Sequence, residues 1–365
     1  MQTSSPKLLS PVQLGALSLP NRVILAPLTR CRAGAERIPN SLMQTYYLQR
    51  VSAGLIISEA TVISPQGIGY LNTPGIYNQE QLIGWKKIVS AIHAEGGHIA
   101  LQLWHTGRAS HSSFQIDKAL PVAPSAIAIK ADGVYTVNGK EEYEIPRALE
   151  IKEVEGIVQD YLNAAIAAKE AGFDALEIHG ANGYLIDQFL QSKTNHRQDS
   201  YGGSKETRFQ FLREIIEAIL TVWDANRVGV RFSPNGIFND VGSPDYREAF
   251  LYYAQELNKY RLAFLHIVDG LGFGFHGLGA PMQLEEFRLV FSGSLIGCCD
   301  YTQEKAETAI EKGYSDLIAF GRPYISNPDL VERFAHDWPL SPWADMSTWY
   351  SSGPEGYIDF PKYNP

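Results

Sequence analysis

The chain has 365 residues, of which 45% are hydrophobic, and its 31 Lys and Arg against 40 Asp and Glu give a net charge of −9. This acidic balance argues against a nucleic-acid partner and against a polybasic membrane surface, and no stretch approaches the ~18 uninterrupted apolar residues of a spanning helix. The three cysteines, Cys31, Cys298 and Cys299, form no C-x-x-C pair, so we expect no disulfide framework, no bound metal and a reducing, cytoplasmic location.

Short apolar runs alternate with longer amphipathic runs along almost the whole chain. The candidate strands are, in chain order, residues 22–26, 55–60, 97–103, 175–179, 228–232, 264–268, 294–297 and 317–320. The helical patterns are residues 41–52, 79–95, 152–171, 205–224, 245–259, 282–291, 302–312 and 327–334. Several strands are solid apolar runs, which indicates burial on both faces of a parallel sheet.

Eight strand–helix units predict an α/β fold, a closed (β/α)8 TIM barrel, with the doubly wound sheet as the competing architecture. We expect one domain over residues 1–365. The residues beyond the barrel fall mainly in a capping insertion after the third strand, residues 106–150, with a hairpin-like segment at 126–143. A C-terminal wrap covers residues 338–365. The insertion follows a strand, so it should cover the face on which barrel enzymes build their sites.

A glycine-rich run at residues 272–277 matches the G-x-G-x-x-G pattern of a dinucleotide fingerprint. That fingerprint requires a helix that opens at the third glycine. The chain instead continues Leu278-Gly279-Ala280-Pro281, which delays any helix. We therefore interpret this run as a loop over the barrel mouth.

Polar residues collect where the predicted strands end. Arg231 lies inside the fifth strand, and a permanent cation in a barrel interior needs an anion or an electron-rich ring as its partner. The turn after the seventh strand and Gly321-Arg322 after the eighth occupy the places where barrels commonly bind phosphate. These positions predict a phosphorylated cofactor across the mouth, with its ring near Thr29, Gln102 and Arg231.

The trio His179-x-x-Asn182-x-Tyr184 follows the fourth strand. Neutral His and Asn side chains can both donate hydrogen bonds to one substrate oxygen and stabilise negative charge that develops there. A phenol with its ordinary pKa near 10 is protonated at neutral pH and can act as a general acid. The trio therefore predicts proton delivery to a substrate whose oxygen is held by two donors.

Taken together, the chain resembles the Old Yellow Enzyme family of FMN-dependent ene-reductases, closest to its bacterial and plant 12-oxophytodienoate-reductase-like members. The resemblance covers essentially the whole length. The motifs that carry it are Leu19-Pro20-Asn21-Arg22, Ala26-Pro27-Leu28-Thr29-Arg30, Ser58-Glu59-Ala60-Thr61, Gln102-Leu103-Trp104-His105-Thr106-Gly107-Arg108, His179-Gly180-Ala181-Asn182-Gly183-Tyr184-Leu185, residues 195–204, Arg231-Phe232-Ser233-Pro234, Ala319-Phe320-Gly321-Arg322-Pro323 and residues 356–361.

The resemblance implies a single barrel that holds FMN tightly. Pro27 and Ala60 would line the flavin through their backbones, Thr29 would bind the flavin O4, and Gln102 would pair with the pyrimidine edge. Arg231 would lie by N1 and O2 and stabilise the reduced ring.

On the phosphate side, the resemblance assigns Cys299, Asp300, Gly321 and Arg322. Here the chain departs from many family members, which carry glycine in the turn where this chain has Cys298-Cys299. If that turn requires a positive φ, we expect strain at Cys299.

For the substrate, the resemblance implies that His179 and Asn182 hold the oxygen while Tyr184 protonates Cα. The residues that would shape the pocket are Trp104, Tyr70 and Tyr350. NADPH, or less efficiently NADH, would deliver hydride to flavin N5 and leave. An enone, enal, maleimide or nitroalkene would then be reduced by net trans addition in a ping-pong cycle. The protein would act as a monomer or homodimer.

Two other classes of function stay open. A barrel hydrolase would use paired carboxylates, for which Glu59, Asp269 and Glu177 are the candidates, although structural hydrogen bonding in the barrel also explains Glu59 and Glu177. A catalytically silent flavin- or ligand-binding barrel is the other alternative.

Overall fold

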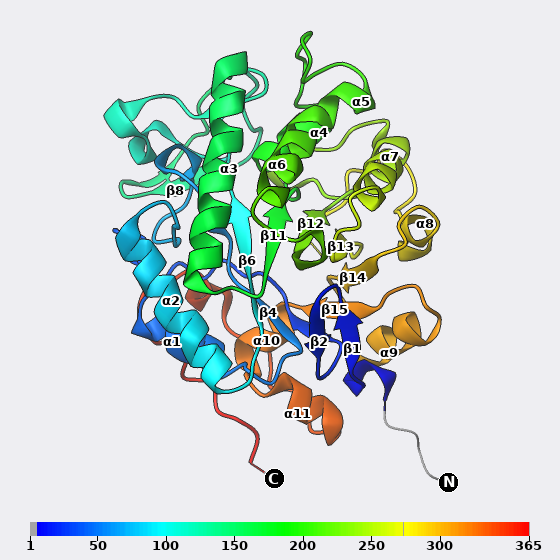
Figure 1. Cartoon of the computed structure of the whole chain (residues 1–365). Helices are drawn as coiled ribbons and strands as arrows, with labels where there is room; N and C mark the ends of the chain where they lie inside the picture. The colour runs from blue at the N-terminus through cyan, green and yellow to red at the C-terminus, as the bar shows by residue number, and fades with distance from the viewer. Residues whose placement is uncertain (1–5, 273, 365) are drawn as a thin grey trace.

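Eight parallel strands close into a ring in the computed structural model, which describes residues 6–272 and 274–364 (Figure 1). The strands follow one another around the ring in chain order. The pairings of β15 with β3 and of β6 with β11 close the ring. Its strands are β3 (Val23–Leu25), β4 (Leu55–Ile57), β6 (Ile99–Trp104), β11 (Ala175–His179), β12 (Val228–Phe232), β13 (Phe264–Val268), β14 (Ser294–Cys298) and β15 (Leu317–Phe320). This closure confirms the predicted TIM barrel and excludes the doubly wound sheet.

The helices surround the barrel, as Figure 1 shows for α2, α3 and α6. The predicted helices are found as α1 (Ser41–Leu48), α2 (Gln79–Ala94), α3 (Ile151–Ala171), α5 (Lys205–Arg208) with α6 (Gln210–Leu220), α7 (Tyr246–Asn258), α8 (Leu284–Arg288), α9 (Gln303–Glu311) and α11 (Leu330–Ala335). Two short helices, α4 (Leu185–Leu190) and α10 (Arg322–Ser326), were not predicted. No helix in the described part of the chain is long and apolar enough to cross a membrane.

Apolar residues fill two layers, one between strands and helices and one inside the ring. A hairpin of β1 (Val12–Leu14) and β2 (Leu17–Leu19) precedes the barrel, and its leucines belong to the inner layer together with Ile24 and Ile57. The strands are thus buried on both faces, which is the physical reason for their solid apolar runs.

The capping insertion lies between β6 and α3. It contains β7 (Val122–Ala123) paired with β10 (Arg147–Ala148), and the antiparallel hairpin of β8 (Val134–Thr136) and β9 (Gly139–Glu141). The hairpin-like segment is therefore confirmed. The remaining elements are β5 (Thr61–Val62) beside β6 and the 3-10 turns Lys7–Leu9, Pro65–Gly67, Ser112–Phe114, Ile116–Lys118, Ala225–Arg227, Phe238–Asp240 and Met346–Thr348.

The C-terminal segment returns to the end of β3. The Arg30 guanidinium donates hydrogen bonds to the backbone oxygens of Trp349, at 3.0 Å, and Gly356, at 2.7 Å. Arg32 donates to the oxygens of Thr348 and Trp349, both at 2.8 Å. Two buried arginines therefore fasten the last residues of the chain to the rim formed by its first barrel strand.

Candidate active site

A cavity of about 420 Å³ opens at the carboxyl ends of β12, β14, β15 and β3. This volume lies within the range typical of small-molecule sites. The predicted site residues that line it are Pro27, Asn182, Arg231, Cys299, Asp300, Gly321 and Arg322. The barrel thus brings the predicted ring-side and phosphate-side residues together on one cavity.

Thr29, Ala60 and Gln102 are not among the residues that line this cavity. Thr29 follows β3 and is half-buried, and Ala60 packs in a small apolar cluster with Trp104 and Tyr184. Gln102 is buried in the middle of β6. Their contact with a flavin ring therefore stays a prediction.

Arg231 is a buried cation with few partners. Its side chain is 5% exposed, one terminal nitrogen donates to Cys298 Sγ at 3.5 Å, and its Nε has no hydrogen-bond partner among the described residues. Buried charges are normally paired, so an arginine in this state is suited to an electron-rich or anionic group in the cavity. The site therefore fits a flavin ring at this position.

The phosphate side is formed by the turn after β14 and the start of α10. Arg322 donates to the Gly272 backbone oxygen at 3.0 Å, and lies 3.7 Å from an Asp300 carboxylate oxygen. Cys299 has a φ of 84° and Asp300 a φ of 58°, so the expected strain at Cys299 is present. Asp269 fixes the turn by accepting from the Cys298 N–H at 3.0 Å.

The glycine-rich run, whose Gly272 contacts Arg322, does not open a helix where the structure describes it. The next helix, α8, begins at Leu284, several residues beyond Gly277. Among the described residues of this segment, which are all but Phe273, no helix opens at the third glycine. The described residues of the run form a loop, which confirms that they are no dinucleotide fingerprint, and the position of the loop over the barrel mouth stays a prediction.

His179 is held as a neutral hydrogen-bond donor. Its Nδ1 accepts from the Ala181 N–H at 3.3 Å, which leaves the ring proton on Nε2. Burial, reinforced by the neighbouring Arg231 and His266, lowers the pKa of His179 well below 6.5. The imidazole is therefore uncharged at neutral pH and donates from Nε2.

Asn182 adopts a left-handed backbone with a φ of 58°. Its N–H donates to Ser233 Oγ at 2.7 Å, and its backbone oxygen accepts from Asn239 Nδ2 at 2.9 Å. These contacts fix the backbone of Asn182, which also lines the cavity. The sequence analysis did not predict Ser233 and Asn239 as partners of Asn182. Ser233 could have been identified, because it follows Arg231 by two residues and so lies on the same face of the strand.

Tyr184 lies in an aromatic cluster with Trp104, Tyr70 and His179. Its ring centroid is 4.9 Å from that of Trp104 and 5.1 Å from that of His179, and its hydroxyl donates to the Tyr70 hydroxyl at 3.2 Å. Burial raises the pKa of Tyr184 above its ordinary value. Tyr350 on the C-terminal segment is 62% exposed, yet close enough to contribute to this shift.

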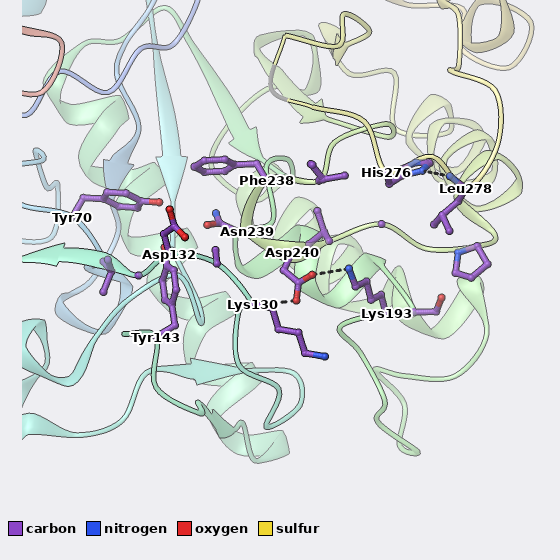
Figure 2. A pocket seen from close by; sticks show the side chains of 18 of the residues that line it. Tyr70, Lys130, Asp132, Tyr143, Lys193, Phe238, Asn239, Asp240, His276 and Leu278 are labelled. Carbon is purple, nitrogen blue, oxygen red and sulfur yellow. Dashed lines mark hydrogen bonds and ion pairs between the residues drawn. The ribbon is translucent and has the colours of Figure 1, made fainter. Parts of the chain in front are cut away.

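A second cavity, a groove of about 1170 Å³, runs between the cap hairpin and the loops that follow β12 and β13. Tyr70 and Asn239 lie at one end of the groove and His276 at the other (Figure 2). Between them Lys193 pairs with Asp240 at 2.7 Å. The Tyr184 hydroxyl is thereby connected, through Tyr70, to a large space under the cap.

The three candidate carboxylates of a hydrolase have separate partners. Glu59 accepts from the Arg30 N–H at 3.1 Å, and Asp269 binds the turn after β14. Glu177 accepts from Gln102 and lies 2.6 Å from a nitrogen of His266. These contacts favour structural roles over a paired acid and base.

Comparison with known proteins places this geometry in a known context. The model of the NADH:flavin oxidoreductase / NADH oxidase family matches residues 7–341. A probable flavin mononucleotide-dependent alkene reductase from Leishmania infantum is 39% identical, over 97% of each chain. The structure of morphinone reductase with tetrahydroNAD superposes with a TM-score of 0.92 at 45% identity, covering 98% of each chain. The Old Yellow Enzyme homologue from Zymomonas mobilis has a TM-score of 0.94 at 41% identity, covering 98% of this chain and all of that one.

Proposed function

Because this chain belongs to the NADH:flavin oxidoreductase / NADH oxidase family, and within it resembles Old Yellow Enzyme, we propose that it binds FMN at the barrel mouth and uses NAD(P)H to reduce activated alkenes. It is an oxidoreductase of the ene-reductase type. The observation that carries the proposal is the shared cavity, which joins the underpartnered cation Arg231 to Asn182 and to Arg322.

FMN, when bound, supplies at its N5 atom the centre that accepts and donates hydride. Arg231 and Gln102 would hold the pyrimidine edge, with Thr29 at O4 and the backbones of Pro27 and Ala60 beside the ring. The phosphate would be bound by the residues at the ends of β14 and β15, namely Cys299, Asp300, Gly321 and Arg322. These assignments are supported by the cavity lining and by the charge of the two arginines.

The residues of the β11 end would hold the alkene. His179 Nε2–H and the Asn182 amide donate to the oxygen of the activating carbonyl or nitro group, where negative charge develops during reduction. Tyr184, kept protonated by burial, delivers a proton to Cα. Trp104, Tyr70 and Tyr350 would shape the space around the substrate.

The reductant would be NADPH, and less efficiently NADH, used in a ping-pong cycle in which the alkene occupies the same space after it leaves. The tetrahydroNAD complex of morphinone reductase supports binding of a nicotinamide coenzyme at this mouth. We further propose a cytoplasmic enzyme that acts as a monomer or homodimer.

The purified protein should be yellow, and denaturation should release one FMN per chain, because the cavity offers cationic partners at both its ring and phosphate ends. Absorbance and fluorescence of the released flavin measure this directly. A colourless protein that takes up no FMN would contradict the proposal. Oxidation of NADPH on addition of cyclohexenone distinguishes the enzyme from a silent flavin-binding barrel, and hydrolysis without flavin would favour the carboxylate alternative.

Neither His179 nor Tyr184 should give an inflection in the pH profile of the alkene half-reaction between about pH 6.5 and 10. The pKa of His179 is lowered well below 6.5 by burial, so its donor form persists as pH rises through that value. The pKa of Tyr184 is raised above 10 by burial, so the acid form is lost only in more alkaline solution. Rapid mixing of the NADPH-reduced enzyme with cyclohexenone measures this rate. An inflection inside the window that persists in the His266→Asn variant would contradict these protonation states of His179 and Tyr184.

A further inference from the structure

A chain of buried polar contacts lies inside the barrel at the level of Gln102. One oxygen of Glu177 accepts from Gln102 Nε2 at 2.6 Å, and its other oxygen lies 2.6 Å from His266 Nδ1. The Glu177 and His266 side chains are fully buried, and Gln102 is 1% exposed. Polar groups placed this deeply are costly unless they are all paired, so such a cluster calls for a reason.

The strand register brings these groups together. Glu177 on β11 lies opposite Gln102 on β6, and His266 on β13 lies opposite Arg231 on β12. The β12 residue opposite Glu177 is Gly229. A side chain would not fit at this position, because an added Cβ would lie only 2.2 Å from the Phe264 ring. With no β12 side chain at that level, Glu177 reaches past β12 to His266.

Arg231 and Cys298, which line the cavity, lie on the strands beside this pair. Burial alone would lower the pKa of His266, but the Glu177 carboxylate raises it. Cys298 accepts from Arg231 at 3.5 Å. The contacts thus form two neighbouring groups, Gln102–Glu177–His266 and Cys298–Arg231, which strand register brings side by side because His266 lies opposite Arg231. Gln102 and Arg231 are both residues assigned to the flavin.

From this arrangement we propose that Glu177 and His266 form a positioning pair for the flavin site, in which Glu177 fixes the orientation of the Gln102 amide and His266 balances the buried carboxylate. This inference rests on the proposed function. A carboxylate only accepts hydrogen bonds, so the Gln102 nitrogen must face Glu177 and its oxygen must point elsewhere. With the carboxylate balanced by His266, Arg231 would supply the net positive charge next to the flavin ring.

The first test separates positioning from general stability. Glu177→Leu removes the acceptor of Gln102 and should raise the Kd of the protein for FMN about tenfold or more. Glu177→Gln restores a carbonyl oxygen at the same place and should bring the Kd back toward that of the parent protein. Glu214 is the matched control, because it also accepts from a glutamine, Gln210 at 2.7 Å, but lies on the outer helix α6.

The second test addresses the charge and does not depend on Glu177→Leu folding. His266→Asn keeps an N–H donor near the position of Nδ1 but removes the positive charge, so it should leave FMN bound. At about pH 6, where His266 with its raised pKa is protonated, the midpoint potential of the bound flavin should become more negative by about 30 mV, a tenfold shift of a two-electron equilibrium. Dye-coupled spectroscopic titration measures it.

The outcomes are distinct. An unchanged Kd in Glu177→Leu, or an equal rise in Glu214→Leu, would overturn the positioning role. An unchanged potential in His266→Asn would overturn the role in charge balance. A parent protein that binds no FMN would instead contradict the proposed function itself.

Discussion

Replacing both His179 and Asn182 by alanine should abolish most alkene reduction while FMN stays bound. Each is a donor to the substrate oxygen, and the loss of one such donor typically lowers kcat by about 10²–10³-fold. Donors that act on one atom are not additive, so we expect a fall of about 10³-fold or more for the pair. Turnover of cyclohexenone and the flavin content of the purified variant measure the two effects.

Ligand binding provides the sharper readout for the same variant. A phenol that binds through its oxygen should perturb the flavin absorbance of the parent protein and lose affinity in the double variant. His276→Ala is a suitable control, because His276 lines the outer groove and donates from Nε2 to the Pro234 oxygen, away from the inner cavity. Unchanged phenol affinity in the double variant would show that the oxygen site lies elsewhere.

Tyr184→Phe should separate the two halves of the catalytic cycle. A general acid contributes about 10²–10⁴-fold, so reduction of the alkene should slow by that factor. Reduction of the enzyme by NADPH needs no proton from Tyr184 and should proceed at the parent rate. Rapid-mixing measurements of each half-reaction give the two rates separately.

Tyr70→Phe is the matched comparison, since it removes the hydroxyl that accepts from Tyr184 and leaves the ring beside Trp104. We expect a smaller loss, because Tyr184 keeps its own proton. If Tyr184→Phe slowed both half-reactions equally, the acid role of Tyr184 would be wrong.

The barrel was predictable because its strands carry a strong local signal. Runs such as Leu55–Ile57 and Leu317–Phe320 are apolar without alternation, and only burial on both faces accounts for that. Helix α4 lacked a comparable signal. All six of its residues are buried, including Asp187 and Gln188, so it has no polar face to mark a helical period. The β1–β2 hairpin has strands of only three residues, too short for periodicity to identify.

Only those site residues whose positions are determined by the end of a strand could be predicted from the sequence. Arg231, Asn182 and Arg322 converge because the carboxyl ends of parallel strands meet at one mouth. The contact of Glu177 with His266 joins residues 89 positions apart and depends on strand register, which no local pattern encodes. Asn239 lies in an irregular loop with a φ of 59°, and its contact with Asn182 depends on that loop's path.

The fastening of the C-terminal segment to Arg30 and Arg32 bears on how the protein is made. The acceptors of Arg30 lie 319 and 326 residues further along the chain. Contacts between such distant residues slow folding, and domains emerge from the ribosome amino end first. When every barrel strand has been synthesised, the nascent chain still lacks the backbone oxygens that accept hydrogen bonds from Arg30 and Arg32. The contacts of these two arginines are therefore among the last of this barrel to form during synthesis, after residues 348–356 have emerged.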